Sequence, residues 1–174
     1  MTVALGEALA RARRAVGEVT DPELPMLTLA DLGVLRGLAI DAGGTVSVTL
    51  TPTYSGCPAL AEMRAAVDRR LRAAGFADIE IRTQLHPPWT TDAITSEGRR
   101  KLAEHGIAPP GARSPGERSP GPVPLVLSPA RRALPCPRCR SVDTEETSRF
   151  GPTPCTALWR CRACREPFEH VKEF

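Results

Sequence analysis

Residues 45–74 read TVSVTLTPTYSGCPALAEMRAAVDRRLRAA and contain the patterns of a strand, a loop and a helix, in that order. From Thr45 to Thr51, apolar and polar residues alternate, as is typical of a strand that is buried on one face. After the loop, Pro58 suits the first turn of a helix, and apolar residues then recur every three or four positions up to Ala74. We therefore predict a helix packed on one face of a β-sheet.

The flanking sequence supplies enough further elements for a small domain. A turn at Asp41–Gly44 joins residues 45–51 to a preceding strand, which predicts a hairpin. The other predicted elements are a helix over residues 3–19, a strand within residues 32–40, a third strand over residues 76–85 and a short helix over residues 96–105, capped by Thr95 or Ser96. Together they predict an α+β fold within residues 1–106, a small three-stranded sheet with helices on one face.

Four cysteines near the C-terminus form two C-x-x-C pairs separated by 21 residues, and they are Cys136, Cys139, Cys161 and Cys164. This spacing is typical of a four-cysteine zinc site. We predict a structural zinc ribbon over residues 134–174, because so short a segment needs a metal to fold. Four thiolates also leave no open position for catalysis at the metal. Free or disulfide-bonded thiols and a rubredoxin-like iron site are the alternatives.

Each of the two remaining cysteines has two interpretations. Cys155 is either a small buried hydrophobe or an extra thiol available as a ligand. Cys57 directly precedes Pro58, so the positive end of a helix dipole is predicted to lower the pKa of its thiol and to favour the thiolate, which binds soft metals. The alternative for Cys57 is an inert cysteine packed in a strand-to-helix turn. His170, just past the second pair, is predicted to be a surface or packing residue.

Two proline-containing loops add candidate residues. Asp21 and Glu23 flank Pro22, where they either form the turn that ends the first helix or offer hard oxygen ligands. The second loop begins at Pro87-Pro88. Either Trp89 fills a gap in the core there, or the stiff loop holds three side chains at the mouth of a site: Trp89, Thr90 and Thr91.

Charge and hydropathy exclude two classes of partner. The formal net charge is +3, and a Pro/Gly-rich linker predicted over residues 107–133 holds four arginines and one glutamate. A nucleic-acid binder needs a concentrated basic face, and the cysteine-rich segment is nearly neutral, so we predict no nucleic-acid partner. No apolar run approaches the roughly 18 residues of a membrane span. The N-terminus does not read as a secretory leader, so we expect no membrane partner and a reducing, cytoplasmic location.

Several of these segments together resemble the iron–sulfur assembly domain of SufT-type proteins. They are Asp21-Pro22-Glu23-Leu24-Pro25, Leu32-Gly33-Val34, Val48-Thr49-Leu50-Thr51, Gly56-Cys57-Pro58 and Pro87-Pro88-Trp89. The cysteine-rich tail, with its Phe150-Gly151-Pro152 segment, resembles one branch more closely. That branch is the PaaD (or PaaJ) family, which belongs to bacterial 1,2-phenylacetyl-CoA epoxidase systems. The resemblance spans nearly the whole chain apart from the linker.

The resemblance implies an accessory protein rather than an enzyme. Its implied role is to help assemble the iron–sulfur cluster of the epoxidase's reductase or the di-iron centre of its oxygenase, with the iron–sulfur assembly machinery as a further partner. Carried over by position, Cys57 handles transient iron or a cluster, with Asp21 and Glu23 as companions. The alternative is a protein-interaction scaffold in the epoxidase system that handles no iron. An exposed sheet edge would favour a homodimer.

Overall fold

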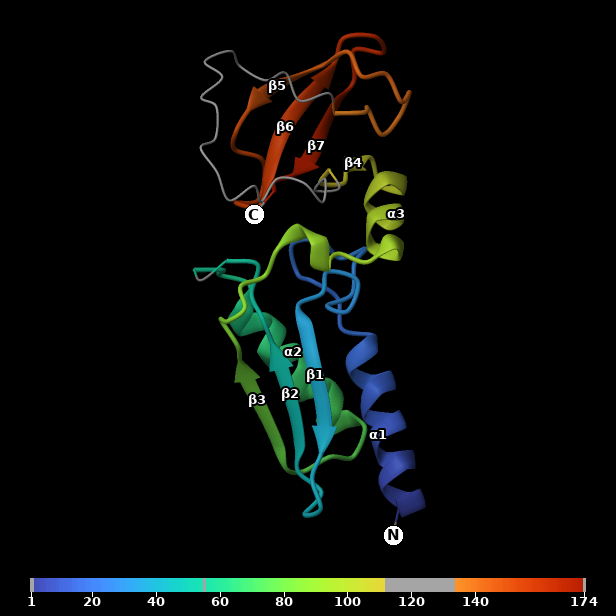
Figure 1. Cartoon of the computed structure of the whole chain (residues 1–174), viewed down its shortest axis with the longest axis vertical. Helices are drawn as coiled ribbons and strands as arrows, with labels where there is room; N and C mark the ends of the chain where they lie inside the picture. The colour runs from blue at the N-terminus through green and yellow to red at the C-terminus, as the bar shows by residue number, and fades with distance from the viewer. Residues whose placement is uncertain (1, 55, 112–133, 174) are drawn as a thin grey trace, which may run out of the picture. The chain divides into compact units, whose positions relative to one another are not determined.

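A computed structural model describes residues 2–54, 56–111 and 134–173 (Figure 1). The chain divides into two compact units, of which the first lies within residues 1–101 and the second within residues 102–173. Among the described residues, no helix has the length and apolar character that a membrane crossing requires.

The first unit is built on a three-stranded sheet in the order β1-β2-β3, and its strands are β1 (Leu35–Ile40), β2 (Val46–Leu50) and β3 (Ile79–Thr83). Strands β1 and β2 form the predicted antiparallel hairpin, with Leu38 opposite Val48. Strand β3 runs parallel to β2, so the chain must cross over between them. Helix α2 (Leu60–Ala73) makes this crossover.

The core of the first unit lies between the sheet and its helices, α1 (Thr2–Gly17) and α2. Three alternating residues of β2 and three apolar residues of α2 are fully buried; they are Val46, Val48, Leu50, Met63, Val67 and Leu71. Burying each such side chain contributes about 1.5–3 kcal/mol. The residues between them on β2, Ser47 and Thr49, are half-exposed. The predicted α+β fold with helices on one face is therefore confirmed.

The sequence also predicts an apolar stripe on the first helix, formed by Leu5, Leu9, Ala12, Val16 and Val19, and this stripe is only partly buried. Ala12, Val16 and Val19 are buried, whereas Leu9 is half-exposed and Leu5 is 42% exposed. The C-terminal half of α1 therefore anchors the helix to the unit.

A short 3-10 helix, η1 (Thr91–Ala93), and helix α3 (Ser96–Glu104) follow the sheet. The Thr95 hydroxyl accepts a hydrogen bond from the Gly98 N–H at 3.0 Å. Of the two predicted caps, Thr95 and Ser96, it is therefore Thr95 that provides the capping hydrogen bond. The loop that contains Gly33 packs closely against η1. A Cβ at Gly33, which has a φ of +67°, would lie 2.3 Å from the Ala93 carbonyl oxygen, so only glycine fits there.

The second unit contains a four-stranded sheet in the order β4-β7-β6-β5, and its strands are β4 (Ile107–Ala108), β5 (Thr144–Ser148), β6 (Thr156–Cys161) and β7 (Pro167–Val171). Strand β6 pairs antiparallel with both β5 and β7. The small core of the second unit includes Leu134, Trp159 and Phe168, packed beside two of the paired cysteines.

The predicted linker differs from the structure at its start. Strand β4 falls at residues 107–108, where parallel pairing with β7 satisfies backbone groups that a linker would leave to water. The rest of the predicted linker falls largely on residues 112–133, which lie outside the described residues. The sequence also predicts that Val123–Leu127 could pair as a strand with the cysteine-rich segment, and these residues lie outside the described ones as well. The division into two modules and a linker stays a prediction.

Candidate functional site

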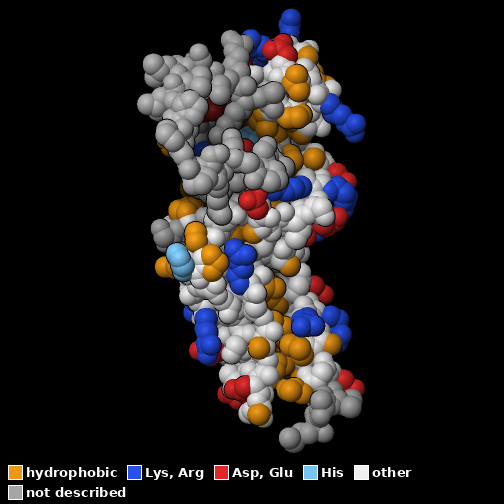
Figure 2. Space-filling view, viewed as in Figure 1, with side chains coloured by type: hydrophobic (Ala, Val, Ile, Leu, Met, Phe, Trp, Pro, Cys, Tyr) orange, Lys and Arg blue, Asp and Glu red, His pale blue; other side chains and the backbone are white. Residues whose placement is uncertain are grey.

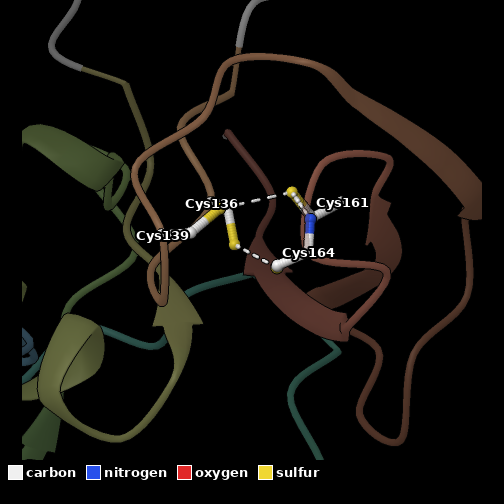
Figure 3. A group of neighbouring side chains, drawn as sticks. All are labelled: Cys136, Cys139, Cys161 and Cys164. Atoms are coloured by element: carbon white, nitrogen blue, oxygen red, sulfur yellow. Dashed lines mark hydrogen bonds between the residues drawn. The ribbon is translucent and has the colours of Figure 1, made fainter.

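The four paired cysteines converge on one point in the second unit (Figure 3). Their sulfur atoms all lie within 4.8 Å of one another. The Sγ atoms of Cys136 and Cys164 are 3.8 Å apart, and those of Cys139 and Cys161 are 3.5 Å apart. Four thiolates at 2.3 Å from a tetrahedral zinc ion would lie about 3.8 Å from one another. The donor set and its spacing therefore fit a closed tetrahedral metal site.

Two tight turns of the same design bring the cysteines together. Directly after each C-x-x-C pair, one residue has a positive φ, +63° at Arg140 and +65° at Arg165. In the first turn the Cys136 N–H donates to the Ser141 carbonyl at 2.9 Å. In the second, the Cys161 N–H donates to the Glu166 carbonyl at 3.0 Å. Each turn thus directs its two sulfur atoms to the same side.

Hydrogen bonding at the cluster favours a thiolate at Cys161. The Cys164 N–H points at the Cys161 sulfur at 3.5 Å, and this bond is the main cause that lowers the pKa of Cys161 to about 7. The Glu166 N–H lowers the pKa of Cys164, but burial and the neighbouring thiols outweigh it and raise that pKa to about 12. Four thiolates this close repel one another, so a bound cation is needed to ionise all of them.

The fifth cysteine of this region is not part of the cluster. The group of four metal-capable side chains found among the described residues does not include Cys155. The Cys155 sulfur instead lies 3.1 Å from the Thr153 hydroxyl. His170 is buried and packs edge-on against Trp159, with ring centroids 5.9 Å apart, so of the two predicted roles, surface or packing, the structure shows packing.

Asp21 has a structural role in the turn that follows α1. It is 5% exposed, and one carboxylate oxygen accepts hydrogen bonds from the N–H groups of Glu23 and Leu24, both at 2.8 Å. Burial raises the pKa of Asp21 above its ordinary value, although these two bonds oppose the shift. The carboxylate is thus held in one orientation in a poorly solvated position.

The thiol of Cys57 lies half-buried in the loop between β2 and α2. Burial is the main cause that raises its pKa, and the nearby negative charges of Glu23 and Asp21 raise it further. Hydrogen bonds with the Ala59 backbone and the Thr53 side chain lower the pKa by less. The predicted lowering of the Cys57 pKa is therefore wrong, because burial and the two carboxylates outweigh the hydrogen bonds that lower it.

The structure thus brings together two loops that are far apart in the sequence. The turn holding Asp21 and Glu23 and the loop holding Cys57 both lie at the end of the sheet where β2 ends (Figure 1). The electrostatic influence of both carboxylates on the thiol places all three groups in one neighbourhood. Thr53, whose side chain hydrogen-bonds to the Cys57 thiol, is a further residue of this site that the sequence analysis did not identify. The sequence does place this hydroxyl residue four positions before the cysteine.

The predicted site-mouth residues Trp89, Thr90 and Thr91 form hydrogen bonds that hold their loop in the first unit. Trp89 is buried, and its indole N–H donates to the Leu32 carbonyl at 2.8 Å. Thr91 is fully buried, and its carbonyl accepts from the Arg99 guanidinium at 2.7 Å. The Thr90 carbonyl accepts from the Ala93 N–H at 2.9 Å. The role of these residues at a site mouth stays a prediction.

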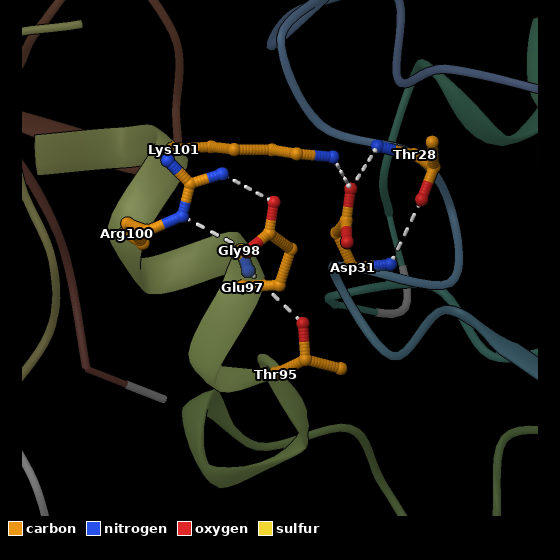
Figure 4. A network of polar contacts seen from close by, with 7 residues as sticks. All are labelled: Thr28, Asp31, Thr95, Glu97, Gly98, Arg100 and Lys101. Atoms are coloured by element: carbon orange, nitrogen blue, oxygen red, sulfur yellow. Dashed lines mark hydrogen bonds and ion pairs between the residues drawn. The ribbon is translucent and has the colours of Figure 1, made fainter. Parts of the chain in front are cut away.

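A buried carboxylate ties α3 to the loop after the Asp21 turn (Figure 4). Asp31 accepts from the Thr28 N–H at 3.0 Å and from the Lys101 ammonium at 2.7 Å, while the Asp31 N–H donates to the Thr28 hydroxyl at 3.1 Å. Burial alone would raise the pKa of Asp31, but the Lys101 and Thr28 bonds outweigh burial and lower it. Sequence reasoning missed this pair, because 70 positions separate its members.

Charges on the surface are mixed. Figure 2 shows basic and acidic side chains interspersed with hydrophobic ones on the visible face. Several are paired, as Arg69 is with Glu62 and Arg162 is with Glu145. This face of the described residues shows no continuous patch of one charge sign, which is what attracts a polyanion.

Comparison with known protein families agrees with both halves of this description. Residues 9–81 match the family described as iron–sulfur cluster assembly protein, and residues 121–172 match the PaaD zinc beta ribbon domain. The solved structure of a domain of unknown function, DUF59, from Bacillus anthracis shares the fold of the first unit. It has a TM-score of 0.53 at 21% identity and covers 59% of this chain and 97% of that one.

Two curated relatives cover different shares of the chain. A protein of Escherichia coli (strain K12), provisionally named as the D subunit of 1,2-phenylacetyl-CoA epoxidase, is 41% identical over 157 residues, or 90% of this chain and 88% of that protein. An Fe-S protein maturation auxiliary factor of Porphyromonas gingivalis (strain ATCC BAA-308 / W83) is 30% identical over 51% of this chain and 85% of that protein.

The fold and the cysteine cluster define a protein that joins an iron–sulfur cluster assembly domain to a zinc beta ribbon. The chain belongs to the PaaD family of 1,2-phenylacetyl-CoA epoxidase subunits.

Proposed function

We propose that this chain is an accessory protein rather than an enzyme, and that it assists assembly of the iron–sulfur cluster or di-iron centre in the reductase or oxygenase of a phenylacetyl-CoA epoxidase. One observation carries the proposal: a domain similar to iron–sulfur maturation factors shares its chain with the ribbon of an epoxidase subunit family. Within that domain, a thiol and two carboxylates share one neighbourhood.

The residues around Cys57 suit iron as a substrate. A thiolate is a soft ligand and carboxylates are hard ones, and iron accepts both. Asp21 is already oriented by two backbone N–H groups that hold one of its oxygens. Glu23 follows on the same turn. In this proposal Cys57 receives the iron or cluster, and the two carboxylates complete its environment.

We infer zinc as the resident metal of the four-cysteine cluster. Its sulfur spacing fits tetrahedral zinc, and a ribbon with a core of so few apolar residues needs a metal to fold. When bound, the ion supplies stability and cross-links the two turns. Because four thiolates fill the coordination shell, no position remains for a reacting water.

The proposed partners are the oxygenase and reductase components of the epoxidase and the iron–sulfur assembly machinery. The proposed location is the cytoplasm, where thiols stay reduced. The exposed β3 edge of the first sheet offers one route to a homodimer.

A complementation experiment tests the iron-handling role. A strain lacking this chain would be supplied with the wild type, with Cys57→Ser, or with Asp21→Asn, which keeps the oxygen that accepts the two N–H bonds but loses the charge. We expect epoxidase components isolated from both variant strains to hold less than half the iron of those from the wild-type strain. Cys155→Ser is the matched control thiol, and it should restore full iron content. Full iron content with Cys57→Ser would overturn the proposal.

The second candidate is a protein-interaction scaffold that handles no iron. Burial raises the pKa of the Cys57 thiol, as in an inert packed cysteine, and this observation favours the scaffold. In the same strains a scaffold requires Cys57→Ser to be silent, whereas Cys161→Ser, which breaks the metal cluster, abolishes epoxidase activity. The two candidates therefore give opposite results for Cys57.

A further inference from the structure

A phenyl ring protrudes from the second unit at the connection between β5 and β6. Phe150 is 80% exposed, the highest exposure among the large hydrophobic residues that the structure describes. A single exposed apolar side chain is common on protein surfaces and needs no partner. What sets this one apart is how the chain holds it and which charges surround it.

The backbone around Phe150 is fixed by short hydrogen bonds. The Ser148 hydroxyl accepts from the Phe150 N–H at 3.1 Å and donates to the Phe150 carbonyl at 2.8 Å. The following Gly151 N–H donates to the Thr156 carbonyl at 3.0 Å, and a Cβ at Gly151 would lie 2.3 Å from the Thr156 hydroxyl oxygen. The ring is therefore presented by a closed loop. Such preorganisation lowers the entropic cost of binding.

One cation lies against the ring, and a second belongs to the residue that precedes Phe150. The Lys172 ammonium lies 5.3 Å from the centre of the Phe150 ring and donates to the Pro154 carbonyl at 2.9 Å. The Arg149 side chain is 88% exposed and forms an ion pair with Glu146, in which the nitrogen and oxygen are 3.9 Å apart. An ion pair this long and this exposed leaves most of the arginine charge available to a partner.

We propose that Phe150, Arg149 and Lys172, here called the hairpin tip, dock a partner protein through an apolar pocket rimmed by carboxylates. Aromatic and arginine side chains are enriched among the residues that dominate binding energy. The two cations require complementary negative charge around the pocket, which steers association and fixes orientation. The inference rests on the proposed function in one respect, because it takes the partner to be a component of the epoxidase.

Direct binding measurements test the hairpin tip. The purified oxygenase and reductase components would each be titrated with the full-length, metal-loaded chain. We expect Phe150→Ala to raise the Kd for one component at least tenfold and Phe150→Leu to raise it less. Arg149→Glu and Lys172→Glu should also weaken binding and reduce its sensitivity to salt. Val142→Ala is the matched control, because Val142 is another exposed apolar residue of this unit, at 61% exposure.

The outcomes separate this inference from the proposed function. Bound zinc and the circular dichroism spectrum of each variant must match the wild type. Unchanged affinity of Phe150→Ala overturns the inference, as does a lack of binding to both components. Self-association of the wild type that Phe150→Ala abolishes also overturns it, because the occupant is then a second copy.

Cys57→Ser should bind like the wild type. Full iron loading by that variant would overturn iron handling and leave the docking result intact.

Discussion

At the scale of single residues, Asp31 shows how one buried carboxylate stabilises the loop beside the candidate iron site. The residue is 8% exposed and has a protonated amine and a backbone N–H as partners. The Asp21 N–H donates to the carbonyl of Leu27, the residue before Thr28, at 2.9 Å. This backbone bond joins the turn that holds Asp21 to the loop that holds Asp31. The Asp31 carboxylate thus lies in a segment that is hydrogen-bonded to the turn of the candidate site.

We predict that Lys101→Met lowers the free energy of unfolding by about 1–2 kcal/mol at pH 7, because a buried carboxylate loses its charged partner. The lowered pKa of Asp31 means that its contribution is fully present above the ordinary aspartate range and is lost as the pH falls through the folded-state value. The variant should thus lose less stability than the wild type between pH 7 and pH 3. Urea unfolding measures this in a Trp159→Phe background, where Trp89 is the sole tryptophan.

The matched control is Arg100→Met. Arg100 and Glu97 pair on the same helix, but their side chains are 54% and 49% exposed. Exposed pairs contribute about 0.2–1 kcal/mol, so this control should shift stability by no more than about 0.5 kcal/mol. Equal effects of the two substitutions would contradict the assigned role of Asp31.

At the scale of secondary-structure elements, the contact between α3 and the loop of residues 28–34 depends on a glycine. A Cβ added at Gly98 would lie 2.8 Å from the Asp31 carbonyl oxygen and 3.1 Å from a methyl carbon of Ile94. Replacing glycine by alanine inside a helix normally stabilises a protein by about 1 kcal/mol. Here we predict that Gly98→Ala destabilises the first unit by about 1–3 kcal/mol, because backbone must move to relieve the overlap.

Gly6 of α1 provides the comparison, since a Cβ there would meet nothing within 4 Å. Gly6→Ala should therefore raise stability by a few tenths to about 1 kcal/mol. Thermal unfolding of both variants measures whether each substitution raises or lowers stability. Stabilisation by Gly98→Ala would show that α3 packs less closely than the structure indicates.

The elements show where sequence patterns succeed and where they fail. Alternation over residues 46–50 predicts β2 because one side of that strand is buried and the other is not. The sequence also predicts a third strand that starts at Phe76, but β3 starts at Ile79. Phe76 instead belongs to the capping turn that follows α2, in which Gly75 has a φ of +87° and the Phe76 N–H donates to the Leu71 carbonyl. An apolar residue at a helix end and one in a strand look alike in sequence.

The candidate sites differ in the same way. Spacing alone predicts which four cysteines converge, because each pair is local and a metal site requires two pairs. The surroundings of Cys57 depend on tertiary contacts, so its burial, its carboxylate neighbours and the sign of its pKa shift required the structure. Local chemistry is readable from a motif, whereas desolvation is not.

At the scale of the whole molecule, the two units obtain their stability from different sources. The first buries strand and helix side chains in a continuous apolar layer, whereas the core of the second has few residues and includes two of the four clustered cysteines. A unit whose core contains its own metal ligands should depend on the metal, and the other should not.

We therefore predict that removing the metal with excess chelator releases about one zinc per chain and unfolds one unit alone. Hydrogen exchange followed by mass spectrometry should show that β5, β6 and β7 lose protection while β1, β2 and β3 keep it. Cys161→Ser should reproduce this pattern without chelator, because it removes a buried ligand of the cluster. Cys155→Ser should retain both the metal and the protection, since that thiol lies outside the cluster. Protection of β6 that survives metal removal would contradict the prediction, and loss of protection in β2 would show that the first unit depends on the metal as well.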